Sequence, residues 1–267
     1  MITYLNGAFI EDNEAMVSVT DRGLTLGDGL FETLYAFDGK PQRLEAHKRR
    51  LFDGAAFLGI PVPLDSNELL EAFTEVLSVN NLDEGVLRLT LTRGSAARGL
   101  TVAAGNPPTL IITASKVPAA AGPAHAWIAR TTSRNELSPL SRFKTLNYLD
   151  NIIARREADK KNATEAILLN SKGFIAEATI ANLFLVVDGR VMTPPVEDGA
   201  LPGVMRADIL SKLNCIETSI PPELFTEASE GFLTNSLGVR PLVSVDGKLI
   251  GDGAMGAVTN QIIRMLG

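Results

Sequence analysis

The feature that most constrains the fold of this chain is an alanine-, proline- and glycine-rich stretch at residues 117–124. Proline and glycine interrupt helices and strands, so the stretch predicts a linker. It separates an N-terminal lobe, residues 1–117, from a larger C-terminal lobe, residues 125–267, with residues 118–124 as the connection. A chain of 267 residues is long enough for one large or two moderate domains with an ample core.

The N-terminal lobe combines strand and helix patterns. It opens with a predicted hairpin at residues 2–10, which turns at Asn6 and Gly7 and does not resemble a signal peptide. The apolar pattern predicts strands over residues 30–37, 86–92 and 109–115 and helices near residues 44–58 and 67–80. These elements indicate an α+β lobe.

The C-terminal lobe is also mixed. Strands are predicted for residues 126–130, 166–170 and 182–187, with a hairpin turn at residues 171–173 and another at residues 246–247. Helices are predicted from Tyr148 to about Asn162, from Val204 onward, and at the C-terminus, where Val258, Ile262 and Leu266 share one face.

Composition excludes several classes of function. The formal net charge of -6, with no long basic run, argues against a nucleic-acid partner. Cys215 is the only cysteine, so an intramolecular disulfide is excluded, and neither His47 nor His125 lies in a pattern of metal ligands. We therefore expect no metal site. No apolar run approaches the length of a membrane span, and we expect a cytoplasmic protein without a membrane partner.

Lys144 is the main candidate for chemistry. A lysine amine attacks an aldehyde only when it is unprotonated, and an apolar setting with nearby cations favours that form. Phe143, Leu146 and Tyr148 supply apolar neighbours, and Arg142 supplies a cation. Such a lysine suits pyridoxal phosphate, whose aldehyde forms a Schiff base with it. The alternative is a solvated loop lysine, which is the commoner case.

Glu177 is the candidate partner for the pyridine ring of that cofactor. The ring acts as an electron sink when a carboxylate keeps its nitrogen protonated. Glu177 lies between two predicted buried strands, and Thr179 and Asn182 are placed to orient it by hydrogen bonds. The alternative is an exposed edge carboxylate on an irregular connection.

A phosphate site is predicted at residues 201–210. Pro202 and Gly203 precede a helical pattern, so the amides of Val204 and Met205 would project from a helix N-terminus and bind an anion. Arg50 and Ser236 are candidates for a matching charge and hydroxyl. Each of the three segments also has an ordinary structural explanation: a capped surface helix, a solvated basic turn and a strand-to-loop transition.

Taken together and in order, five motifs resemble those of the fold-type IV pyridoxal-phosphate enzymes, the class IV aminotransferase family. They are residues 21–33, 47–51, 143–148, 177–184 and 201–206. The family holds branched-chain aminotransferases, D-amino-acid aminotransferases and aminodeoxychorismate lyases, and the resemblance spans nearly the whole chain. It implies an α/β (α+β) protein of two lobes, the smaller N-terminal one α+β and the larger C-terminal one a mixed, β-barrel-like lobe with helices. It also implies a homodimer.

The resemblance implies a role for each matching residue. Lys144 would bind the aldehyde, Glu177 the ring nitrogen, and Tyr148 would lie near the ring hydroxyl, with Leu201 packed on the ring. The phosphate would contact Arg50, Asn235, Ser236 and the amides of Val204 and Met205. Aminotransferases often carry an Ile-Thr pair where this chain has Val204 and Met205, so contacts there must come from the backbone alone. We expect the cofactor in a crevice between the lobes, with Lys144 and Glu177 from the second lobe and Arg50 from the first.

The resemblance leaves the reaction open. The Arg98-Gly99 pair and residues 234–237 are similar to lyase sequences, and Leu100 replaces a histidine that D-amino-acid aminotransferases tend to have. The favoured reading is a 4-amino-4-deoxychorismate lyase that forms pyruvate and 4-aminobenzoate for folate synthesis. In this reading Arg98 holds a substrate carboxylate, Phe31 walls the pocket and Thr33 helps to protonate the departing group.

Alternatives remain open for the function and for three of the residues. The enzyme could be a transaminase for branched-chain or D-amino acids, or the chain could be a non-catalytic protein that binds pyridoxal phosphate. Phe31 and Thr33 could instead serve core packing, and Arg98 could be a solvated loop residue.

Overall fold

The computed structural model describes residues 1–103 and 105–266 and divides the chain into two compact units. Unit 1 contains Met1–Pro118 and Phe143–Asn147, and unit 2 contains Ala119–Arg142 and the chain from Tyr148 onward. Of the expected linker at residues 118–124, residues 118–123 form neither helix nor strand, and Ala124 already begins a strand.

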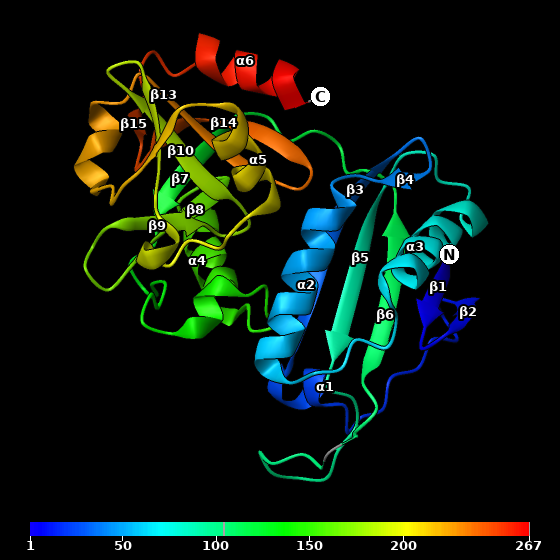
Figure 1. The fold of residues 1–267 in the computed structure, drawn as a ribbon. Coiled ribbons are helices and arrows are strands. Elements are labelled where there is room, and N and C mark those ends of the chain that lie inside the picture. The colour runs from blue at the N-terminus through cyan, green and yellow to red at the C-terminus, as the bar shows by residue number, and fades with distance from the viewer. Residues whose placement is uncertain (104, 267) are drawn as a thin grey trace. The chain divides into compact units, whose positions relative to one another are not determined.

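Unit 1 is built on a six-stranded antiparallel sheet with the order β2-β1-β6-β5-β3-β4 (Figure 1). Its strands are β1 (Ile2–Leu5), β2 (Ala8–Glu11), β3 (Gly29–Phe37), β4 (Lys40–Pro41), β5 (Gly85–Thr92) and β6 (Thr109–Ser115). The first two form the expected hairpin. Asn6 and Gly7 have φ values of 49° and 94°, as a tight hairpin turn with two left-handed residues requires.

The helices of unit 1 are α1 (Arg22–Leu26), α2 (Leu44–Leu58) and α3 (Ser66–Val79). The two long ones cover one face of the sheet (Figure 1). Side chains alternate along β3, so Leu30, Leu34 and Ala36 point into the core beneath these helices. α3 begins with a capping box, in which the Asp65 side chain accepts from the Glu68 amide and Glu68 reaches back to the Asp65 amide.

The segment that carries Lys144 completes the unit 1 sheet. At the free edge of β3, the Phe31 amide donates to the Lys144 carbonyl at 2.9 Å and the Leu146 amide donates to the Gly29 carbonyl at 3.0 Å. The two rings of Phe143 and Phe57 stack with centroids 4.5 Å apart, which fixes the segment against α2. We expected Lys144 in the second lobe, but backbone pairing assigns it to unit 1, because an exposed strand edge recruits a nearby extended segment.

Unit 2 is built on a nine-stranded mixed sheet that curls around itself (Figure 1). The order is β12-β11-β10-β13-β14-β7-β8-β9, with β15 paired to β14. The strands are β7 (Ala124–Ile128), β8 (Glu165–Leu169), β9 (Ile175–Ala178), β10 (Asn182–Val187), β11 (Arg190–Thr193), β12 (Cys215–Glu217), β13 (Glu230–Asn235), β14 (Gly238–Val245) and β15 (Lys248–Leu249). β7 pairs in parallel with β8 and β14, and β11 pairs in parallel with β12.

Three α-helices and three short 3-10 helices surround this sheet. They are α4 (Leu149–Asp159), α5 (Val204–Lys212), α6 (Ala257–Leu266), η1 (Pro139–Arg142), η2 (Val196–Asp198) and η3 (Pro222–Thr226). β10 is buried on both faces: Leu183 and Leu185 belong to one apolar cluster, and Phe184 and Val186 belong to another with Met205 of α5. This explains the nearly continuous apolar run of β10 in the sequence.

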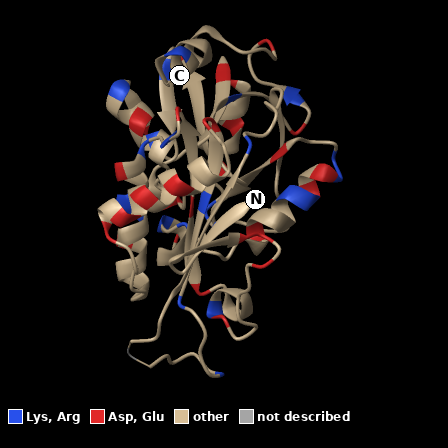
Figure 2. Cartoon of the chain, turned by 90° about the vertical axis from the view of Figure 1, so that its right-hand side faces the viewer, with Lys and Arg blue, Asp and Glu red and all other residues tan. Residues whose placement is uncertain are grey.

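Both units agree with the expected fold class, because each combines a sheet with helices. Several short elements were not foreseen, among them the one-turn helix α1 and the strands β4, β11 and β12, whereas β9, which carries Glu177, is the strand that follows the expected hairpin turn at residues 171–173. Charged side chains lie mostly on helices and loops, while the strands are largely uncharged (Figure 2). Within residues 1–103 and 105–266, no helix combines the length and apolar character needed to cross a membrane.

Candidate active site

Lys144 contacts an aromatic ring of β3. Its Nζ lies 4.3 Å from the centroid of the Phe31 ring, and the guanidinium carbon of Arg88 lies 4.0 Å from the same centroid. Phe31 is only 6% exposed, so the lysine amine meets a mostly buried ring beside a second cation. An apolar contact and a neighbouring cation are features that activate lysine amines in proteins.

Thr33 lies on the same face of the sheet as Phe31. The two residues are two positions apart on β3, and side chains of a strand alternate between its faces. Thr33 is half-buried and stands opposite Arg88 in the register of β3 and β5. Phe31, Thr33 and Arg88 thus form one surface beside the segment that carries Lys144.

Arg50 is held by a buried acid on the other face of β3. Its Nε and its second terminal nitrogen donate to the two carboxylate oxygens of Glu32 at 2.7 and 2.6 Å. His47 Nδ1 lies 2.7 Å from Glu32 Oε2. Burial raises the pKa of the Glu32 carboxyl, but the charge and hydrogen bonds of Arg50, with those of His47, outweigh burial and lower this pKa to about 2. The Glu32 carboxylate thus fixes the direction of the Arg50 guanidinium on α2.

Glu177 in unit 2 is 6% exposed and lies beside an arginine that the sequence analysis missed. Arg134 Nε lies 3.1 Å from Glu177 Oε1 and also donates to the Gly199 carbonyl at 3.0 Å. A second Arg134 nitrogen donates to the Ser141 carbonyl, which fixes the guanidinium. A buried carboxylate requires such a compensating cation. No local pattern around Arg134 points to this contact, because only the folding of unit 2 creates it.

The neighbours expected to orient Glu177 divide into two cases. Asn182 Nδ2 lies 3.5 Å from Glu177 Oε2, at the limit of a hydrogen bond, and donates at 2.8 Å to the Leu201 carbonyl. The Thr179 hydroxyl donates its hydrogen bond to Glu165 and not to Glu177. Instead, the Leu201 amide donates to Glu177 Oε2 at 2.9 Å. The carboxylate is therefore connected directly to the turn that precedes α5.

The start of α5 has no side-chain cap. Gly203 lies so close to Asn182 that a Cβ on it would meet the amide oxygen at 1.9 Å, so only glycine fits there. Gly203 offers no side-chain cap to α5, so the first amides of the helix, including those of Val204 and Met205, receive no capping side chain. Uncapped N-terminal amides attract anions through hydrogen bonds and the helix dipole.

Thr234, at the end of β13, adds an unsatisfied hydroxyl to this region. It stands opposite Asn182 in the register of β10 and β13, is 2% exposed, and its Oγ1 has no hydrogen-bond partner among the described residues. A buried hydroxyl without a partner costs free energy unless a ligand or water satisfies it. Together with the uncapped amides of α5, it fits a phosphate group. Asn235 and Ser236 were the residues predicted for this region, and Thr234 was not among them.

The remaining predicted site residues lie as follows. Asn235 Oδ1 accepts from the Leu237 amide, and Ser236 is half-buried. Tyr148 is half-buried and directly precedes α4. Arg98 is exposed and lines a pocket of about 350 Å³ with Val19, Thr20, Arg22, Thr25, Leu26 and residues 96–100; this lining includes neither Phe31 nor Lys144. Leu100 is 83% exposed. No group of three or more possible metal ligands occurs in the described part of the chain.

The structure thus groups the predicted residues within each unit. In unit 1, Lys144 contacts Phe31, Thr33 lies on the same face of β3 as Phe31, and Arg50 is tied to the same strand through Glu32. In unit 2, Glu177, Leu201 and the start of α5 form a connected set, with Thr234 opposite Asn182. One set offers an amine, and the other offers a carboxylate and an anion site.

Comparisons with known proteins show the family to which the chain belongs. Residues 29–245 match the family described as Amino-transferase class IV. A protein of Methanocaldococcus jannaschii, proposed to be a branched-chain-amino-acid aminotransferase, is 36% identical over 98% of this chain and 94% of its own length. A D-alanine aminotransferase of Staphylococcus haemolyticus is 31% identical over 97% of this chain and 94% of its own.

A solved structure from Legionella pneumophila is also similar. That protein, proposed to be a 4-amino-4-deoxychorismate lyase, superimposes with a TM-score of 0.88 at 33% identity and covers 96% of this chain and 97% of its own. The family match extends over most of the chain, and the likenesses cover nearly all of it. This protein therefore belongs to the class IV aminotransferase family, whose enzymes use pyridoxal 5'-phosphate as their cofactor.

Proposed function

We propose that this protein is a 4-amino-4-deoxychorismate lyase, which forms pyruvate and 4-aminobenzoate in folate biosynthesis. The observation that carries the proposal is the position of Thr33 on the same face of β3 as Phe31, whose ring contacts the Lys144 amine. Removal of an enolpyruvyl group needs a proton taken from one atom and a proton delivered to another. A threonine hydroxyl on the face of β3 whose Phe31 ring the lysine amine contacts supplies a second group, so that a different group can carry out each transfer.

The cofactor contacts follow from the two sets of residues. We assign Glu177, with Arg134 behind it, to the ring nitrogen, Leu201 to a face of the ring and Tyr148 to its hydroxyl. The phosphate is assigned to the amides of Val204 and Met205, the Thr234 hydroxyl and the Arg50 guanidinium, with Asn235 and Ser236 alongside. The unpartnered Thr234 hydroxyl and the uncapped helix support this placement.

The chain's own groups then divide the work of the reaction. When bound, pyridoxal phosphate supplies an electron sink for the carbon that loses its proton. The Lys144 amine takes that proton, and Glu177 supplies a fixed negative charge at the ring nitrogen. Thr33 delivers a proton to the methylene carbon of the leaving group, and Arg98 binds a substrate carboxylate.

A transaminase for branched-chain or D-amino acids is the second candidate. The similarity to the Methanocaldococcus and Staphylococcus proteins favours it. It would use the same contacts to the cofactor and the same lysine. It would not need a proton donor at Thr33, so this residue distinguishes the two candidates.

The test measures the activity of the purified protein towards aminodeoxychorismate and towards amino acids. We expect pyruvate release from aminodeoxychorismate, and no rapid conversion of the cofactor to its amine form by leucine, valine, D-alanine or D-glutamate. In Thr33→Val, which preserves the side-chain volume, pyruvate release should fall on the order of 100-fold, as for the loss of a general acid. Thr33→Ser, which keeps the hydroxyl, serves as the matched control and should retain most of the activity.

Two results would contradict the lyase. Wild-type activity in Thr33→Val would show that Thr33 is not a proton donor and serves only in packing. Rapid and complete conversion of the cofactor by an amino acid, without pyruvate from aminodeoxychorismate, would make the transaminase the better assignment. The cofactor absorbance of each variant shows whether it binds the cofactor normally.

We further propose that the enzyme acts as a cytoplasmic homodimer on a small-molecule substrate. Support for the dimer comes from exposed apolar side chains around α1 in unit 1, at Met16, Val19, Leu24 and Leu26. Monomeric proteins seldom leave such clusters open to water.

A further inference from the structure

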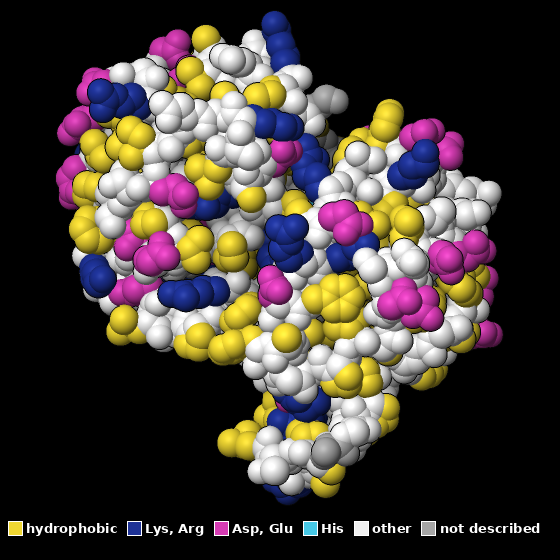
Figure 3. All heavy atoms as spheres, in the orientation of Figure 1, with side chains coloured by type: hydrophobic (Ala, Val, Ile, Leu, Met, Phe, Trp, Pro, Cys, Tyr) yellow, Lys and Arg dark blue, Asp and Glu magenta, His cyan; other side chains and the backbone are white. Residues whose placement is uncertain are grey.

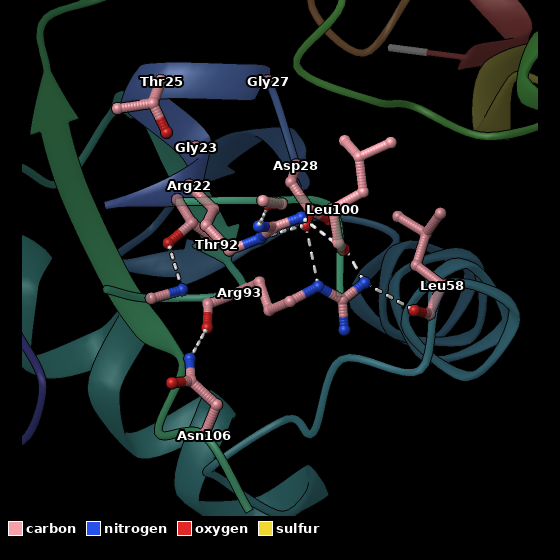
Figure 4. A network of polar contacts seen from close by, with 12 residues as sticks. Arg22, Gly23, Thr25, Gly27, Asp28, Leu58, Thr92, Arg93, Leu100 and Asn106 are labelled. Carbon is pink, nitrogen blue, oxygen red and sulfur yellow. Dashed lines mark hydrogen bonds and ion pairs between the residues drawn. The ribbon is translucent and has the colours of Figure 1, made fainter. Parts of the chain in front are cut away.

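Asp28, in the turn between α1 and β3, joins two arginines. Its Oδ2 accepts from Arg22 Nε and Arg93 Nε, both at 2.8 Å, and its Oδ1 accepts from a second Arg93 nitrogen at 3.2 Å (Figure 4). Arg22 is 5% exposed. Burial raises the pKa of the Asp28 carboxyl, but the hydrogen bonds and charges of Arg93 and Arg22 outweigh burial and lower it. The acid and the two arginines therefore form a stable ionic cluster.

The other nitrogens of these arginines bind backbone carbonyls from two different segments. Arg22 donates to the Gly99 carbonyl at 2.7 Å and the Leu100 carbonyl at 3.2 Å (Figure 4). Arg93 donates at 2.7 and 2.9 Å to the carbonyls of Leu58 and Gly59, at the C-terminal end of α2. Cations stabilise the unpaired carbonyls at the end of a helix. One carboxylate thus links the end of α2 to the loop that carries Arg98.

The ends of that loop are fixed separately from its tip. Thr92, just before the loop, and Thr109, just after it, donate hydroxyl hydrogen bonds to buried Asp21. Asn106 donates to the Arg93 carbonyl at 2.5 Å and closes the base of the loop. The tip consists of residues 96–103. Among these described residues, the hydrogen bonds to the rest of unit 1 are those from the Arg22 side chain and one of 3.4 Å from the Ala96 amide to the Thr20 carbonyl.

The tip is otherwise exposed. Residues 97–100 are all exposed, and hydrophobic and basic side chains lie together around the loop at the bottom of Figure 3. The pocket of about 350 Å³ that Arg98 lines has the tip as one wall and Val19, Thr20, Arg22, Thr25 and Leu26 as the other. Without the hydrogen bonds from Arg22, few contacts would define where Arg98 points.

We propose that Arg22, oriented by Asp28, is a positioning residue that holds the loop tip so that Arg98 meets the substrate carboxylate. This inference rests on the proposed role of Arg98. Arg22 is itself directed to Asp28 and to two carbonyls, so it acts through the loop and not on the substrate. Its planar, forked guanidinium is suited to bind three acceptors at once, which a lysine cannot do in the same geometry.

The first test measures the loop directly in the holoenzyme and is independent of activity. In Arg22→Met, we expect amide hydrogen exchange at Leu100 and Thr101, and trypsin cleavage after Arg98, to become at least tenfold faster. Arg22→Lys, which keeps a charge beside Asp28, should lie between this variant and the wild type. Arg240→Met is the matched control, because Arg240 also binds backbone carbonyls, those of Gly122 and Pro123, but in unit 2.

The second test separates binding from turnover. We expect Arg22→Met to raise the KM for aminodeoxychorismate about tenfold with a smaller change in kcat, and to have little further effect in an Arg98→Met background. Asp28→Asn should raise the KM less than Arg22→Met does, since Arg22 keeps its carbonyl partners in that variant. An equal rise in KM in the Arg98→Met single variant and in the Arg22→Met, Arg98→Met double variant would show that Arg22 acts through Arg98.

The outcomes distinguish this inference from the proposed function. Unchanged exchange and cleavage of the loop in Arg22→Met overturn the inference, whatever the activity. A normal KM in Arg22→Met, alongside a raised KM in Arg98→Met, overturns it as well. If exchange rises but Arg98→Met has a normal KM, the loop is held as inferred, and the carboxylate role assigned to Arg98 is wrong.

Discussion

Glu177 illustrates how the chemistry of one residue depends on partners from distant parts of the chain. Its two carboxylate oxygens meet Arg134 and the Leu201 amide, so both its charge and its direction are set by the fold of unit 2. If Glu177 is to hold a charge against a ring nitrogen, a fixed orientation of its carboxylate matters more than a high basicity. Preorganised charges of this kind are a major source of rate enhancement in enzymes.

Removal of the Arg134 charge should therefore slow the enzyme. In Arg134→Met we expect turnover to fall about 10- to 100-fold, since hydrogen bonds to a charged group contribute roughly 1.5–3 kcal/mol. Steady-state kinetics and the cofactor absorbance measure the effect. Arg130→Met removes an exposed arginine of the same segment and is the control. If Arg134→Met slowed a Glu177→Gln enzyme as much as it slows the wild type, Arg134 would not act through Glu177.

At the scale of elements, Glu32 fastens α2 to β3. Its carboxylate lies on the core side of β3 and binds Arg50 and His47, one turn apart on α2. Burial alone would disfavour its charge, but the two basic partners outweigh burial and lower its pKa from 4.5 to about 2. The helix that carries Arg50 is thus attached to the strand that carries Phe31 and Thr33.

This attachment predicts a specific loss of stability in acid. Because the folded-state pKa of Glu32 is lowered, its contribution is complete above pH 4.5 and is lost as the pH falls from 4.5 towards 2. The full loss is on the order of 3 kcal/mol. We expect the difference in thermal unfolding between the wild type and Glu32→Gln to shrink over this range, with the exposed Glu71→Gln as control. A constant difference down to pH 3 would contradict the ionic role of Glu32.

At the scale of the whole molecule, the apolar cluster around α1 predicts self-association. Met16, Val19 and Leu24 are 76%, 81% and 69% exposed. Burial of such side chains against a second copy removes apolar surface from water. Light scattering should give twice the mass of one chain, and Val19→Glu with Leu24→Glu should shift it towards the monomer. Leu137→Glu alters an equally exposed leucine of unit 2 and is the control. A monomeric wild type would exclude the homodimer.

The local sequence predicted most of the elements that carry the site. Apolar periodicity predicted β3, β5, β6, β10 and α2 closely, because burial of one face imposes a period on neighbouring residues. Local sequence also predicted the Asn6-Gly7 turn and the start of α5 after Gly203, because the backbone geometry at these positions restricts which residues fit. The helix α1 was not foreseen because a single turn is too short to show periodicity.

The tertiary structure alone decided which groups meet. The segment of Lys144 joined the free edge of β3, Thr179 turned to Glu165, Arg134 reached Glu177, and Thr234 was left with an unsatisfied hydroxyl. Each of these outcomes joins residues far apart in the chain or depends on strand register. Polar side chains bind the partners that folding brings within about 3 Å, and no local pattern encodes that proximity. The sequence by itself determined the elements and the kind of chemistry, while the packing of distant segments decided the partners of each reactive group.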